Sequence, residues 1–239
     1  MKISQHSFNL MPVVRDVIAG NRVPAQFQRP YVWSQADVLA LCTSILEGFP
    51  IGGFLTWIPG KHADISKVAR GRLGPMHVAD VDGGVSLLLD GQNRLATLAW
   101  MSLKDEPMPT DMAPGELATW GSGHRLVADG ITKSFKFVLT AEADEGFNVP
   151  AWVFVAQESV NPYLRAQRKG RWVDCDEAAL DELETWVDHV RDRFREARVT
   201  ETIIHDATTA QAKTAFLRIC KVGVAMTAED FDAATNWTE

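Results

Sequence analysis

The sequence has few cysteines and no long hydrophobic run. Its three cysteines, Cys42, Cys175 and Cys220, are widely spaced and include no Cys-x-x-Cys pair. This spacing excludes the usual zinc sites and a disulfide framework, and it favours a reduced, cytoplasmic setting. No apolar run approaches the roughly 20 residues of a membrane span. The N-terminal residues also lack the apolar stretch of a signal peptide, so we expect no contact with a membrane.

Positive charge is also scarce. The chain carries 24 Lys and Arg against 31 Asp and Glu, and its formal net charge is -7. This balance does not indicate nucleic-acid binding, although a local basic patch can still form. The six histidines are scattered and form no clustered His-Asn-His arrangement. We therefore expect that this chain alone does not cleave DNA by that chemistry.

Hydrophobic residues are plentiful, at 46% of 239 residues, which is enough to bury the core of one large domain or of one domain with a helical appendage. A helix is predicted over 34–46, because Ser34 and Asp37 resemble a capping box and Gly48 suits a C-cap. The clearest amphipathic helix is predicted over 176–198. Periodicity and turn residues also predict a helix over 13–18, an extended segment over 22–27, a loop followed by a strand within 50–58, and strands over 85–89, 124–128 and 135–140. They further predict loops over 104–123 and around Pro162, an apolar run over 149–155, and helices over 208–221 and from Thr227.

The stretch 85–98 carries the strongest indication of function. A short apolar run reads as a buried strand, and Asp90-Gly91-Gln92-Asn93-Arg94 leads from it into an apolar-periodic helix. The N–H groups of a first helical turn and the helix dipole favour an anion such as phosphate, and an arginine can fork onto it. Asp90 could hold a metal ion or polarise a water molecule. The alternative is that Asp-Gly is only a turn and Asp90 only a helix cap.

A second polar and aromatic segment, Gln28-Arg29-Pro30-Tyr31-Val32-Trp33, precedes the first predicted helix. The simpler interpretation is that Tyr31 and Trp33 are core anchors whose polar tips find partners. The functional interpretation places Gln28 and Arg29 in the same pocket as residues 90–94. The basic residues within 59–82, namely Lys61, Lys67, Arg70 and Arg72, are expected to lie on a solvated loop rather than against nucleic acid.

Together these segments carry a family resemblance. The motifs 28–33, Ser44-Ile45-Leu46-Glu47-Gly48-Phe49-Pro50-Ile51-Gly52 and 90–98 follow one another in this order. The chain resembles the N-terminal domain of the GmrSD type IV restriction enzymes, which is marked by a QR-x-Y-x-W segment and a DGQQR motif. The residues 215–223, followed by 227–230, resemble a later element of that family. This family belongs to the ParB/sulfiredoxin-like superfamily.

The resemblance implies an α+β fold, with a ParB/sulfiredoxin-like mixed α/β core over 1–160 and a helical C-terminal region over 161–239 packed on it. It implies binding, and expected hydrolysis, of a nucleoside triphosphate in defence against foreign or modified DNA, with Mg²⁺ as the expected cofactor. Matched position by position, the catalytic candidates are Asp90, Gln92 and Arg94, and Asp90 is also the metal candidate. The nucleotide-binding candidates are Gln28, Arg29, Tyr31, Trp33, Gly91 and Asn93.

Two positions depart from the family pattern. Asn93 replaces the second glutamine of the motif, so a direct contact could become water-mediated. Cys220 replaces an asparagine of the late element, which puts any function of that side chain in doubt.

Other functions remain open. The main alternative is a non-catalytic sensor or adaptor that binds nucleotide or DNA and recruits a separate nuclease through the helix 176–198 or the loop 59–82. Direct DNA binding in the ParB manner is disfavoured by the acidic balance. A sulfiredoxin-like reductase is disfavoured because no cysteine lies beside residues 90–94. A homo-oligomer is a further expectation.

Overall fold

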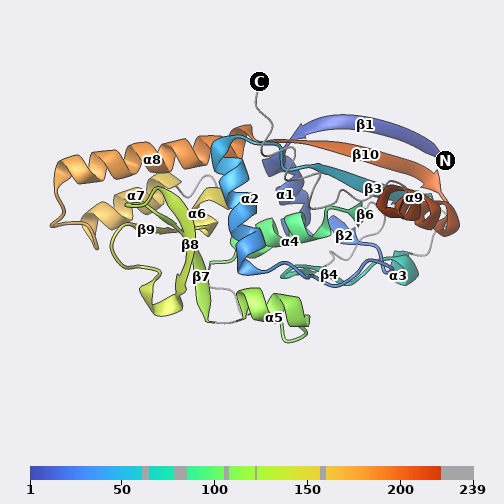
Figure 1. Cartoon of the computed structure of the whole chain (residues 1–239), viewed down its shortest axis with the longest axis horizontal. Coiled ribbons are helices and arrows are strands. Elements are labelled where there is room, and N and C mark those ends of the chain that lie inside the picture. The colour runs from blue at the N-terminus through green and yellow to red at the C-terminus, as the bar shows by residue number, and fades with distance from the viewer. Residues whose placement is uncertain (61–64, 78–84, 105–107, 122, 157–159, 222–239) are drawn as a thin grey trace, which may run out of the picture.

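A computed structural model describes residues 1–60, 65–77, 85–104, 108–121, 123–156 and 160–221. Its main sheet has five strands in the order β1-β10-β3-β6-β2 (Figure 1). Parallel and antiparallel neighbours alternate across this sheet. The mixed α and β fold expected from the sequence is therefore confirmed. The strands are β1 Lys2–Asn9, β2 Arg22–Pro24, β3 Gly53–Pro59, β6 Ser86–Asp90 and β10 Arg198–Ala207.

The central strands β3 and β6 bury side chains on both faces of the sheet, because successive side chains of a strand point to opposite faces. Phe54 of β3 and Leu88 of β6 point into the main core, whereas Leu55 and Leu87 point into a smaller core on the opposite face. Helices α1, α2 and α4 are among those that contribute to the main core, and α9 covers the smaller one (Figure 1). These helices are α1 Leu10–Ile18, α2 Gln35–Glu47, α4 Gln92–Met101 and α9 Thr209–Lys221.

Two smaller antiparallel sheets complete the described strands: β4-β5, and β8-β7-β9, which has helices around it (Figure 1). No helix in the described ranges is long and apolar enough to cross a bilayer. The elements not yet given are α3 Ile65–Val68, β4 Arg72–Leu73, β5 Met76–His77, α5 Pro114–Trp120, β7 His124–Asp129, β8 Ser134–Leu139, η1 Thr140–Glu142, β9 Asn148–Pro150, α6 Trp152–Val155, α7 Val160–Lys169 and α8 Glu177–Glu196.

Local sequence signals set the ends of α2 as predicted. The backbone N–H of Ser34 donates to the Asp37 carboxylate at 2.8 Å, and the N–H of Asp37 donates back to the Ser34 hydroxyl at 3.4 Å. Gly48 ends the helix in the left-handed region, at a φ of 80°. These contacts satisfy backbone groups that a helix end leaves unpaired.

Several expectations were incomplete. The region 161–239, expected to be helical, supplies α7, α8 and α9 but also β10, which lies between β1 and β3 in the main sheet. The loop expected over 104–123 contains α5, and Pro162 lies in the first turn of α7, where proline is tolerated. The helix start predicted at Thr227 lies outside the described residues.

A buried ion pair joins the strands of the main sheet. The carboxylate of Glu201 on β10 is 1% exposed and accepts hydrogen bonds from Arg22 of β2 and Thr56 of β3. Arg22 also donates to Thr56 at 3.0 Å. A charged side chain within β10 interrupts its apolar pattern, which explains why this strand was not predicted. The pairing compensates for the loss of solvent around both charges.

We expect Glu201→Gln to destabilise the protein by about 3–5 kcal/mol, because it leaves the Arg22 guanidinium buried without its carboxylate. Urea unfolding measures the effect, with Glu196→Gln at the exposed end of α8 as the control. The double variant Arg22→Met with Glu201→Leu should recover much of the loss. A single variant as stable as the wild type would show that this pair does not hold the sheet.

Candidate functional site

The turn between β6 and α4 has the geometry of an anion site. Gly91 is the N-cap residue, with a φ of 91°, and its carbonyl accepts from the N–H of Leu95. No side chain of the described residues caps this helix. The N–H groups of the first turn, from Gln92 onward, therefore have no side-chain acceptor and point their partial positive charge out of the helix end.

A cavity of about 310 Å³ opens at this turn, and we call it the motif pocket. It collects eight of the nine candidate residues from two segments that are far apart in the sequence. Its walls are Gln28, Arg29, Trp33, Asp90, Gly91, Gln92, Asn93 and Arg94. The functional interpretation of the 28–33 segment, that Gln28 and Arg29 share a pocket with residues 90–94, agrees with this geometry.

Tyr31 is the candidate that does not line the motif pocket. Its side chain lies in the main core at 3% exposure, and its hydroxyl is 2.9 Å from that of Thr97. The hydroxyl also accepts from the indole N–H of Trp120 at 3.3 Å. Burial raises the pKa of Tyr31 to about 12. Tyr31 is thus a core anchor with a satisfied polar tip.

Two other candidates hold the pocket together. The Gln28 side chain is buried and donates to the carbonyl of Leu89, at the end of β6, at 2.5 Å. The Asn93 side-chain oxygen accepts from the backbone N–H of Val32 at 3.3 Å. These amides fix the segment 28–33 against the strand-to-helix turn. The direct contact of Asn93 uses a side chain one methylene shorter than the family's glutamine.

Arg94 acts as a clamp rather than as a free cation. Its guanidinium donates to the carbonyl of Ile51 at 2.5 Å and to that of Gly53 at 2.7 Å. The Asp90 carboxylate lies 3.8 Å from the same group, and the Phe54 ring lies beneath it at 5.3 Å. Burial lowers the pKa of Arg94, against the opposing effect of Asp90.

The position of the Arg94 guanidinium explains why residues 52 and 91 are glycines. At Gly52, whose φ is 83°, an added Cβ would lie 2.0 Å from the Arg94 guanidinium. At Gly91 it would lie 2.2 Å from the Phe54 ring and 3.3 Å from Arg94. Both positions also adopt a backbone conformation that other residues rarely take. Glycine is therefore required on both sides of Arg94.

Fewer side chains of the motif pocket remain available to a ligand than the sequence suggested. Asp90 has a half-exposed side chain, and Arg29 is exposed at the rim. The side-chain oxygen of Gln92 is buried and has no hydrogen-bond partner within the described part of the chain. No group of three or more His, Cys, Asp and Glu among the described residues could hold a metal ion by itself.

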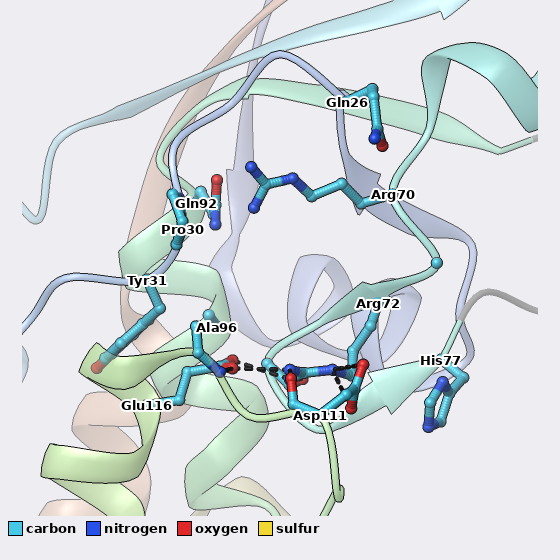
Figure 2. Close-up of a pocket in the computed structure, with 13 residues that line it drawn as sticks. Gln26, Pro30, Tyr31, Arg70, Arg72, His77, Gln92, Ala96, Asp111 and Glu116 are labelled. Carbon is cyan, nitrogen blue, oxygen red and sulfur yellow. Dashed lines mark hydrogen bonds and ion pairs between the residues drawn. The ribbon is translucent and has the colours of Figure 1, made fainter.

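Figure 2 shows a second cavity of about 500 Å³, which we call the side pocket. Gln92 lines both this cavity and the motif pocket. Arg70 donates to the carbonyls of Gln28 and Arg29, and Arg72 forms a bidentate pair with Glu116 at 2.9 and 2.8 Å.

The expectation of a solvated loop was therefore wrong for Arg70 and Arg72. Both arginines line the side pocket, as do Gln26 and Glu116. None of these four was predicted from the sequence as a site residue. The polar excursion around the two arginines gave no periodic signal that could have placed them there.

The fold and the two cavities define a mixed α/β domain whose polar pocket opens at the start of a helix, where proteins commonly hold phosphate. The chain belongs to the GmrSD restriction endonuclease N-terminal domain family, whose model matches residues 13–231. No curated protein matches the sequence. The Cys220 side chain, one of the two departures from the family pattern, lies outside the part that the structure describes.

We expect Arg94→Ala to lower the free energy of unfolding by about 2–3 kcal/mol, because two carbonyls lose charged hydrogen-bond donors. Arg29→Ala, in the same pocket but exposed, should change it by about 0.5 kcal/mol or less. Urea unfolding without ligand measures both. Equal stability of the two variants would show that Arg94 is not a structural clamp.

Proposed function

We propose that the motif pocket binds the phosphates of a nucleoside triphosphate and that the domain hydrolyses it. The carrying observation is that eight of the nine candidates line one cavity at the start of α4. The proposal includes a ParB/sulfiredoxin-like assignment of the core, supported by the mixed sheet and by the strand-to-helix turn.

The charges of the motif pocket suit an anion. Asp90 and Arg94 lie 3.8 Å apart and partly neutralise one another. Arg29 then leaves the pocket with excess positive charge, next to the N–H groups of the first turn of α4. In this arrangement the backbone and Arg29 hold phosphate oxygens, while Arg94 keeps the turn in shape.

The residues present fit a magnesium ion that arrives with the nucleotide. Mg²⁺ commonly takes only one or two carboxylates together with substrate phosphates and water. Asp90 is the half-exposed carboxylate that would hold it. When bound, the ion neutralises phosphate charge.

We expect the wild-type protein to release phosphate from at least one of the four nucleoside triphosphates in Mg²⁺. Asp90→Asn should lower that rate by 100-fold or more, because it removes the carboxylate that orients the metal ion or the water. It should still bind the nucleotide in EDTA, as measured by calorimetry. A variant that releases phosphate at the wild-type rate would exclude Asp90 from catalysis.

Nucleotide binding should also depend on Arg29. Arg29→Ala should weaken it about tenfold or more, because a charge-assisted hydrogen bond to phosphate contributes about 1.5–3 kcal/mol. Arg165→Ala, an exposed position on α7, serves as the charge-matched control. Calorimetry in EDTA measures both, and equal affinities of the two variants would argue against Arg29 as a phosphate ligand. Binding without any release by the wild type would favour the sensor or adaptor that recruits a separate nuclease.

A further inference from the structure

The side pocket lies on the other side of the 28–33 segment from the motif pocket. Gln28 and Arg29 line the motif pocket, whereas the next two residues, Pro30 and Tyr31, line the side pocket. Gln92 lines both cavities. A ligand that fills the motif pocket and extends past Gln92 therefore enters the side pocket.

The side pocket differs from the motif pocket in its charge. Arg72 is neutralised by its bidentate pair with Glu116 and by Asp111, whose carboxylate is 3.3 Å away. Arg70 is the other arginine of the wall, and it already donates to two backbone carbonyls. A neutral, polar group suits such a wall better than a second phosphate does.

Hydrogen-bonding groups gather at one end of the side pocket. Figure 2 shows the Arg70 guanidinium reaching toward Gln92 and Pro30, with Gln26 above the backbone end of the Arg70 side chain. The side-chain oxygen of Gln92 is buried without a partner, which costs free energy until a ligand donor reaches it. Glutamine amides and arginine are the side chains that commonly read the edges of nucleobases.

We propose that the side pocket receives the nucleoside part of the nucleotide, and that Gln26, Arg70 and Gln92 read its base. This rests on the proposed function, because the phosphates are placed in the motif pocket. The volume of the side pocket, about 500 Å³, lies within the usual range for small-molecule sites. The base preference of the domain is then set partly outside the motif residues, at Gln26 and Arg70.

The test compares a ligand with a nucleoside and one without. Calorimetry in EDTA gives the dissociation constants of sodium tripolyphosphate and of the four nucleoside triphosphates. The proteins are the wild type, Gln26→Ala, and Gln5→Ala on β1, at the opposite edge of the main sheet from β2. Gln26 is exposed, so its truncation should leave the fold intact, which urea unfolding checks.

The wild type should prefer one nucleotide over the others and over tripolyphosphate. Gln26→Ala should weaken binding of that nucleotide about tenfold and narrow the differences among the four, because a base contact is lost. Its affinity for tripolyphosphate, and all affinities of Gln5→Ala, should stay within twofold of wild type.

Two results separate this inference from the proposed function. If Gln26→Ala binds all ligands as the wild type does, or loses tripolyphosphate and nucleotide equally, the side pocket does not read the base, while phosphate binding stands. If the wild type binds neither tripolyphosphate nor any nucleotide, the proposed function fails and this inference fails with it.

Discussion

One guanidinium joins the parts of the site. Arg94, near the start of α4, holds the carbonyls of Ile51 and Gly53 where β3 begins, and it approaches the carboxylate of Asp90. Without it, two inward-facing carbonyls would lose charged donors and the turn before β3 would lose its contact with the helix. The family motifs around positions 51 and 90 are therefore two sides of one packing arrangement, although more than thirty residues separate them.

The motif residues that line the pocket fall into two groups with different roles. The side chains of Gln28, Asn93 and Arg94 form hydrogen bonds with backbone groups and so shape the cavity. Asp90 and Arg29 remain accessible to a ligand. A motif recognised in a sequence does not distinguish these roles, because both kinds of residue are polar and both lie beside the same turn. Hydrogen-bond partners in the folded chain make the distinction.

Local patterns predicted the parts of the fold whose information is local. Ser34 and Gly48 mark the ends of α2, and the apolar run before Asp90 marks β6. The strands β1 and β10 escaped prediction because each is recognised only through its partner, about 200 residues away, and because β10 carries the buried Glu201. Arg70 reaches the site only through tertiary contacts to backbone carbonyls, which no sequence spacing reveals.

The position of β10 has a consequence for how the chain is made. Because β10 lies between β1 and β3, the main sheet cannot close until residue 207 has left the ribosome. At synthesis rates of about 5–20 residues per second, β3 waits roughly 7–30 s with one edge unpaired, because about 148 residues separate its end from the end of β10. An open strand edge is prone to pair with other chains. Nascent copies of this protein therefore expose a strand edge to one another during that interval.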